Sequence, residues 1–177
     1  LANLAQVMLE RGCTIGLATD PDADRLGLIV RTRDNRSVFF TGNEIGAVIL
    51  QARISAARRA GALHARTLFI NTVVTSSLQR VIAKRNGLQV VGDLMVGFKY
   101  MGHVLRCIER NGRYPGEQAA AELDRCTASP ADFLFTTEEA HGFLLSPEVR
   151  DKDACGAGVF LAGLASDLAD IGCDLSG

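Results

Sequence analysis

The sequence lacks an excess of charge of either sign. Its 177 residues include 19 basic and 20 acidic side chains, a formal net charge of −1, so nothing favours a nucleic-acid partner or a membrane surface. No apolar run approaches the length of a membrane span, and the first residues show no signal-peptide pattern. Hydrophobic residues reach 47%, which is ordinary for a globular protein. We therefore expect a cytoplasmic protein with room for one large domain, or for one domain and part of another.

The sequence also lacks paired cysteines. Its five cysteines are scattered, odd in number and form no CxxC pair, which is typical of reduced thiols in a cytosolic protein. The three histidines have no zinc-type spacing with them. Of these histidines, only His141 lies in a loop that we consider below as a candidate site. These absences argue against a disulfide scaffold and against a zinc site.

Three aspartates are concentrated in residues 19–25, TDPDADR. Asp20, Asp22 and Asp24 alternate with other residues, and short apolar stretches at 14–18 and 26–30 flank them. Both flanks are typical of strands, so the aspartates are predicted to lie on a tight strand-to-strand connection. Carboxylates this close repel one another unless a cation neutralises them. Hard oxygen ligands at this spacing suit Mg²⁺ or Ca²⁺ better than zinc.

Two other interpretations of this acidic stretch were considered. An EF-hand calcium loop needs glycine at position 6 and glutamate at position 12, and Arg25 and Arg31 stand there instead. A solvated acidic turn is the simpler alternative, but three aspartates in five residues between two buried strands favour a metal site. Arg25 could temper the local negative charge or bind a phosphate.

The rest of the chain alternates strand and helix patterns. Helices are expected at 2–11, 42–60, 78–86, 98–109 and 153–171, and strands at 37–40, 67–74, 88–91 and 132–136. Thr41 and Glu44 have the spacing of a capping box. Residues 111–130 lack a strand pattern and are expected to form a surface insertion with one helical turn at 118–124. The order predicts the α/β class: a layered α/β/α domain with a mixed sheet at 41–177, preceded by a partial domain of the same class at 1–40.

Three motifs resemble the phosphoglucomutase/phosphomannomutase (α-D-phosphohexomutase) superfamily. TDPDADR at 19–25 resembles its metal-binding loop, and VGFKYMG at 96–102 resembles its TGFKYIG segment. TEEAHGFL at 137–144, with RDKDA at 150–154, is similar to its sugar-binding loop. The motifs occur in the family's order and span residues 13–154. The resemblance implies that 1–40 is the end of the family's second domain and that 41–177 is its third, sugar-binding domain.

The resemblance also implies a chemistry. Members of the family move a phosphoryl group between positions 1 and 6 of a hexose, through a phosphoserine and a hexose 1,6-bisphosphate. The partners are then hexose phosphates, and the cofactor is Mg²⁺ held by Asp20, Asp22 and Asp24. The implied catalytic residues are Arg25 and Lys99, and the implied substrate-binding residues are Gly97, Glu138, Ala140, Arg150 and Lys152. Many relatives have serine where this chain has Ala140, which puts one hydroxyl contact in doubt.

Simpler roles stand beside three of these assignments. Lys99 could be an ordinary solvated lysine, since lysine is usually exposed. Arg150 and Lys152 could belong to a charged turn before a helix.

Two of the family's motifs are absent from the sequence. It has no TASHNP-like stretch with a phosphorylatable serine and no RxSGTEP-like phosphate loop. We therefore expect that the remaining mutase domains lie outside this chain and that the chain alone is inactive. We also expect an uncovered apolar face on 1–40, which could make the chain a homodimer. The alternatives are a phosphopentomutase or glucose-1,6-bisphosphate synthase of the same superfamily, or a non-catalytic module that binds a metal or a sugar phosphate.

Overall fold

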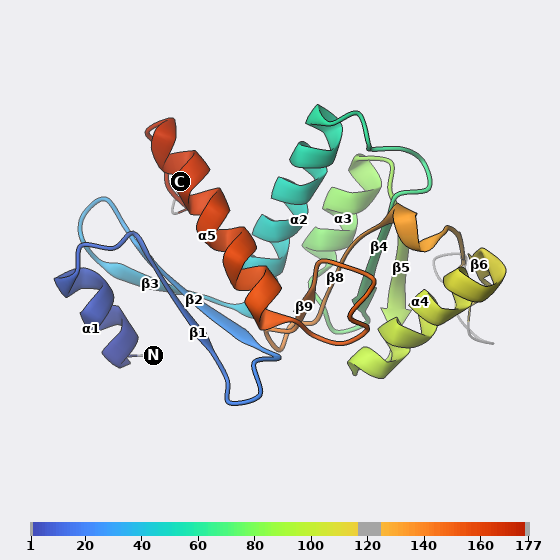
Figure 1. Cartoon of the computed structure of the whole chain (residues 1–177), viewed down its shortest axis with the longest axis horizontal. Coiled ribbons are helices and arrows are strands. Elements are labelled where there is room, and N and C mark those ends of the chain that lie inside the picture. The colour runs from blue at the N-terminus through green and yellow to red at the C-terminus, as the bar shows by residue number, and fades with distance from the viewer. Residues whose placement is uncertain (1, 117–124, 176–177) are drawn as a thin grey trace.

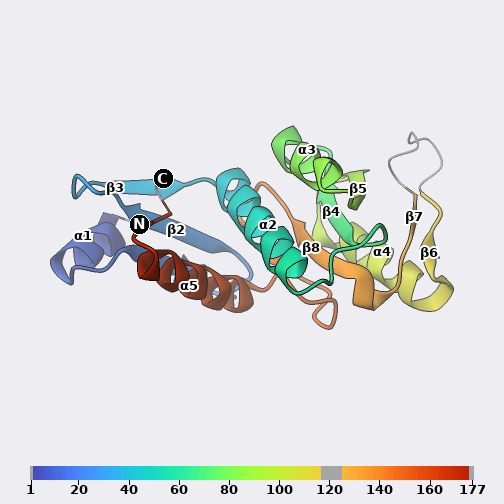
Figure 2. The same ribbon diagram turned by 90° about the horizontal axis from the view of Figure 1, so that it is seen from above.

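A computed structural model describes residues 2–116 and 125–175, arranged as two larger β-sheets side by side with helices around them and a short two-stranded pair (Figures 1 and 2). The helices are α1 (Ala2–Glu10), α2 (Gly42–Arg59), α3 (Ser77–Arg85), α4 (Phe98–Asn111) and α5 (Ala154–Asp170), with a 3₁₀ turn η2 (Pro130–Asp132). The first strands are β1 (Ile15–Thr19), β2 (Leu26–Arg31) and β3 (Ser37–Phe40). The later strands are β4 (Leu68–Thr72), β5 (Gln89–Leu94), β6 (Arg113–Tyr114), β7 (Cys126–Thr127), β8 (Phe133–Thr137) and β9 (Phe143–Leu144). The helical turn predicted at 118–124 lies outside the described residues.

The first sheet is an antiparallel meander in the order β1-β2-β3. Thr19 pairs with Leu26 at its end, so the acidic stretch forms the turn between β1 and β2, as its flanks predicted. Side chains alternate between the two faces of a strand, and Leu26, Leu28 and Val30 of β2 are all buried on one face.

Two helices cover this sheet. Helix α5 packs against β1 and β2, and Leu26 is the neighbour of Gly158 on that helix. Helix α1 packs on the other face, where Gly16 has no side chain and a Cβ there would lie 3.1 Å from Leu4 Cγ. Figure 2 shows α5 lying along the sheet. These helices cover part of the apolar surface that was expected to be open on 1–40, whereas Val38 and Phe39 of β3 are each 44% exposed.

The second sheet has the order β5-β4-β8-β9. Strands β5, β4 and β8 are parallel, and β9 is antiparallel to β8. In β4, Phe69 packs in the core on the side of α2 and α3, while Leu68 and Ile70 pack in the core on the side of α4. This confirms the predicted α/β/α layers around a mixed sheet (Figure 1).

Local signals were confirmed at α2 but not in the insertion. Thr41 Oγ1 accepts a hydrogen bond from the Glu44 backbone N–H at 3.4 Å, and a Glu44 carboxylate oxygen accepts from the Thr41 N–H at 2.7 Å. The expectation that 111–130 holds no strand was wrong, because β6 and β7 form a short antiparallel pair. The side chain of Gln89 hydrogen-bonds both the N–H and the C=O of Thr127. These two hydrogen bonds attach β7 to Gln89 at the start of β5.

The closing helix α5 buries only part of its apolar surface. Val159 on the helix and Ile171 just after it are 76% and 72% exposed. Its buried residues are Ala154, Ala157 and Leu161. In the part of the chain that the structure describes, no helix is both long and apolar enough to cross a membrane.

Candidate active site

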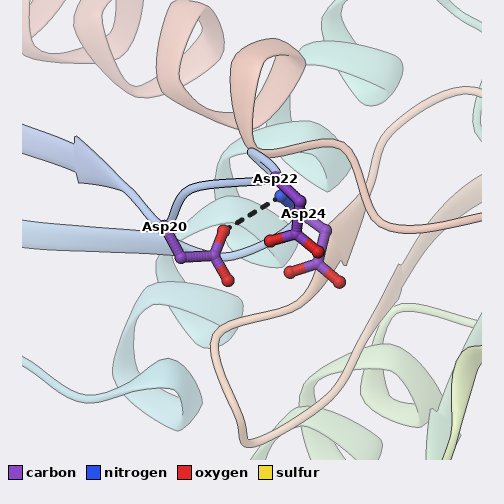
Figure 3. A group of neighbouring side chains, drawn as sticks. All are labelled: Asp20, Asp22 and Asp24. Carbon is purple, nitrogen blue, oxygen red and sulfur yellow. Dashed lines mark hydrogen bonds between the residues drawn. The ribbon is translucent and has the colours of Figure 1, made fainter.

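The acidic turn is folded around Asp20. Its Oδ1 accepts hydrogen bonds from the backbone N–H groups of Asp24, at 3.1 Å, and Arg25, at 3.0 Å. These bonds bend residues 20–25 back on themselves, with Ala23 in the left-handed region at φ 56°. One carboxylate oxygen each from Asp20, Asp22 and Asp24 then lies within 4.8 Å of the other two (Figure 3).

Arg25 neutralises part of this charge. Its Nε lies 2.8 Å from Asp20 Oδ2 and 3.3 Å from Asp24 Oδ1. The pKa of Asp20 is lowered, chiefly because its carboxylate accepts the Arg25 backbone N–H, and the pKa of Arg25 is raised by its hydrogen bond to Asp20. The Arg25 side chain is 57% exposed, so a bound anion could reach it.

Lys152 approaches the same turn from the other side. Its Nζ lies 2.9 Å from Asp24 Oδ2 and 3.2 Å from Asp151 Oδ1, and its side chain is only 18% exposed. Burial lowers the pKa of Lys152, but hydrogen bonds to Asp24 and Asp151 outweigh it, and the net shift is upward. The ammonium also lies 5.2 Å from the centre of the Phe98 ring. The charged ammonium of Lys152 is therefore held against the acidic turn.

Glu138 lies beside Lys152 at the carboxyl end of β8. It is 6% exposed, and its Oε1 accepts a hydrogen bond from the Gly97 backbone N–H at 2.8 Å. Burial raises its pKa, opposed by the Gly97 hydrogen bond and the positive charge of Lys152. A Cβ at Gly142 would lie 2.5 Å from Lys152 Cδ and 3.4 Å from Glu138 Oε2. The missing side chain at Gly142 thus leaves the space in which Lys152 passes Glu138.

Backbone contacts hold these segments together. The Leu26 N–H donates to the His141 carbonyl at 3.1 Å, and the His141 ring Nδ1 lies 3.0 Å from the Leu26 carbonyl. The Ala154 N–H at the start of α5 donates to the Ala23 carbonyl. His141 is thus the residue of the sugar-loop motif that fixes it to β2. The sequence signalled His141 only by its place in that motif.

Two predicted residues point elsewhere in this structure. Lys99 is exposed, and its Nζ lies 5.0 Å from the centre of the Tyr100 ring. Arg150 Nη2 lies 2.5 Å from Glu109 Oε2 on α4, away from the acidic turn. Ala140 does reach the site: it lines a hollow of about 540 Å³ together with Asp20 and Arg25.

Sequence reasoning missed two residues of the site. Asp151 shares the Lys152 ammonium with Asp24. Thr72 Oγ1, at the carboxyl end of β4, donates to Glu139 Oε2 at 3.5 Å. The sequence could have indicated Asp151, because this acidic residue directly precedes the candidate residue Lys152. Thr72 had no local signal, because its partner is 67 residues away.

The acidic turn fits a divalent cation of the hard type. Oxygens on opposite sides of Mg²⁺, each at about 2.1 Å, are about 4.2 Å apart, close to the 4.8 Å limit of this cluster. Asp22 is exposed, and its carboxylate accepts no hydrogen bond among the described residues. Arg25 and Lys152 already contact oxygens of Asp20 and Asp24. A bound metal must therefore share these oxygens with the two side chains or displace them.

Comparisons with known proteins agree with the motifs. Residues 41–170 match the model of the family "Phosphoglucomutase/phosphomannomutase, alpha/beta/alpha domain III". A phosphoglucomutase from Staphylococcus aureus (strain USA300) is 32% identical over 152 residues, which cover 86% of this chain and 23% of that protein. The chain thus spans about a quarter of the length of the curated relatives it matches.

Two solved structures share the fold. Parafusin, a phosphoglucomutase from Paramecium in an open form, matches with a TM-score of 0.64 at 18% identity, over 96% of this chain and 25% of that chain. The N-acetylphosphoglucosamine mutase of Aspergillus fumigatus, in complex with GlcNAc-6P and magnesium, matches with a TM-score of 0.56 at 14% identity, over 97% and 35%.

Proposed function

Because this chain belongs to the phosphoglucomutase/phosphomannomutase family, we propose that it supplies the metal-binding and sugar-recognising parts of a phosphohexomutase. The reaction would interconvert hexose 1-phosphate and hexose 6-phosphate through a phosphoserine and a 1,6-bisphosphate. One observation carries the proposal. Lys152 contacts Asp24 of the metal turn and passes directly beside the buried Glu138, so the two motifs form one site.

The acidic turn would hold Mg²⁺ through Asp20, Asp22 and Asp24. When bound, the ion neutralises charge on the phosphoryl group that is transferred. Arg25 keeps the turn folded and presents an exposed guanidinium to an anion. The Aspergillus mutase, which binds GlcNAc-6P and magnesium, supports a sugar phosphate and Mg²⁺ as the ligands here.

Glu138 would accept hydrogen bonds from sugar hydroxyls. Its Oε1 is already held by the Gly97 N–H, so Oε2 is the oxygen left for the sugar. A buried carboxylate discriminates between hydroxyl orientations because a mismatched partner leaves it unpaired. Lys152 would place its positive charge next to a substrate phosphate.

The remaining assignments are weaker proposals. Lys99 would assist proton transfer, and Arg150 would contact phosphate, only after their side chains leave Tyr100 and Glu109. Ala140 offers the sugar no hydroxyl. The division of the chain at residues 40/41, the cytoplasmic location and the homodimer stay predictions. We also propose that the chain by itself does not convert hexose phosphates, because no phosphorylatable serine motif is present in it.

The experiment tests a longer protein that contains this chain. Asp22→Asn should sharply lower turnover of glucose 1-phosphate and weaken Mg²⁺ binding in calorimetry, because it removes one of three carboxylate ligands. Asp167→Asn, an exposed aspartate on α5, is the matched control and should behave as the unmodified protein. Unchanged turnover in Asp22→Asn would refute the assignment of Asp22 as a metal ligand. Faster turnover of pentose than of hexose phosphates would favour the pentomutase alternative, and binding without turnover would favour the module.

A further inference from the structure

A second hollow lies at the opposite end of the four-stranded sheet from the candidate active site. Glu138 follows the carboxyl end of β8, whereas this hollow of about 370 Å³ is lined by Thr67 and Phe133, at the amino ends of β4 and β8. Its other walls come from the last turns of α2 and from Phe160 of α5. The volume is in the range of small-molecule pockets.

An unpaired arginine lines this hollow. Arg53 of α2 has a buried Nε without a hydrogen-bond partner, and among the described residues its guanidinium has no ion pair. Its Cζ lies 5.9 Å from the centre of the Phe160 ring. Burial lowers the pKa of Arg53. An Nε that has lost water without gaining an acceptor is unfavourable, so an anion bound by this side chain would restore a lost interaction.

The one acidic residue in the lining, Asp132, is already used. Its Oδ2 accepts from the Ser129 N–H at 2.6 Å and hydroxyl at 2.9 Å. Its Oδ1 lies 3.3 Å from Arg66 Nη2 and 3.4 Å from His64 Nε2. The charge of Asp132 is therefore compensated by Arg66, whereas no carboxylate among the described residues pairs with Arg53.

We propose that this hollow binds a small organic anion with one phosphate or carboxylate group and a compact apolar body. The anionic group pairs with the fork of Arg53, whose N–H groups match two oxygens of such an anion. The apolar body lies against Phe160, Ala57 and Leu134. The site shares no residue with the acidic turn or the Glu138 loop, so it stands independently of the mutase proposal.

The test is a titration of the full 177-residue chain with phenyl phosphate, followed residue by residue by NMR. We expect saturable shifts at Arg53 and Phe160, and weaker binding of inorganic phosphate, which has no apolar body. Arg53→Met should weaken phenyl phosphate binding about tenfold or more, the scale of a lost charge-assisted hydrogen bond. Arg59→Met, an exposed arginine on the same helix, is the matched control and should bind as the unmodified chain.

Two further measurements keep the result interpretable. Arg53→Lys keeps the charge but loses the fork, so its affinity should fall between those of the unmodified chain and Arg53→Met. The thermal midpoint of Arg53→Met should not fall, because the substitution removes a buried Nε that has no hydrogen-bond partner. Shifts confined to the acidic turn, no saturation, or equal affinity in Arg53→Met and the unmodified chain would each overturn the proposal.

Discussion

Replacing Glu138 by glutamine should improve stability and impair function. Glu138 is 6% exposed, and burial raises its pKa. A raised pKa means that the folded chain holds this proton more tightly than the unfolded chain. The contribution to stability is complete below the unfolded pKa and is lost as the pH rises through the folded pKa. At neutral pH the ionised carboxylate therefore costs stability.

The structure indicates what glutamine would keep. Its amide oxygen can take the position of Oε1 and accept the Gly97 N–H, now at 2.8 Å. Its NH₂ then replaces Oε2, the oxygen on the side of Gly142 and Lys152. The favourable interaction of the carboxylate with Lys152 is lost, but the net upward shift of the pKa shows that burial outweighs it. The free energy of unfolding at neutral pH should therefore rise.

The effect on function should have the opposite sign. A sugar hydroxyl that donates to Oε2 would meet an N–H group instead. The loss of a hydrogen bond to a charged group is about 1.5–3 kcal/mol, which corresponds to a fall in kcat/KM of about 10- to 150-fold. This measurement uses a longer protein that contains the chain, because turnover is proposed only for that protein.

Urea unfolding of the 177-residue chain at about pH 5 and about pH 8 checks the first effect. The gain from Glu138→Gln should be larger at the higher pH. Glu148→Gln changes an exposed glutamate of the following loop and should leave both quantities unchanged. A variant less stable than the unmodified chain at pH 8, or one with unchanged kcat/KM, would refute the reasoning.

Two further predictions follow from single contacts. Lys152→Met should tighten Mg²⁺ binding about two- to fivefold in calorimetry, because the metal no longer competes with an ion pair to Asp24 worth about 0.5–1 kcal/mol. The same variant should bind sugar phosphate more weakly, and looser Mg²⁺ binding would show that Lys152 does not compete. Thr41→Ala should lower the free energy of unfolding by about 1 kcal/mol through loss of the α2 capping box, and an unchanged urea midpoint would contradict that role.

Features that depend on neighbouring residues could be predicted from the sequence. The acidic turn between β1 and β2 needs only two apolar stretches and the residues between them. The capping box of α2 joins Thr41 to Glu44, three residues apart. Such contacts form whatever the rest of the chain does, so the pattern is sufficient.

The packing of α5 could not be predicted in the same way. Its sequence is apolar or small on nearly every side, and the pattern does not single out one face. Val159 and Ile171 have large apolar side chains, and both are exposed. The helix instead turns Ala157 and Gly158 toward the first sheet, because small residues allow a helix to approach a strand closely. Only the tertiary arrangement decides between these faces.

The motifs indicated segments that the structure brings close together, but they did not indicate the direction of each side chain. Arg150 and Lys152 stand two residues apart in one loop, and both were expected to bind substrate. In the structure Arg150 pairs with Glu109 on α4, and Lys152 pairs with Asp24 in the turn between β1 and β2. Each partner is far along the chain, so no local pattern distinguishes the two.

The candidate site lies where the two sheets meet, which makes its geometry depend on that junction. Asp24 lies in the turn between two strands of the first sheet, Glu138 directly follows a strand of the second, and Lys152 passes between them. Their relative position is fixed by the hydrogen bonds that join Leu26 to His141 and Ala23 to Ala154. Since Leu26 is also 1% exposed in the shared core, a change that loosens this core would separate the acidic turn from the Glu138 loop. The site therefore depends on the packing of α5 as well as on the residues that form it.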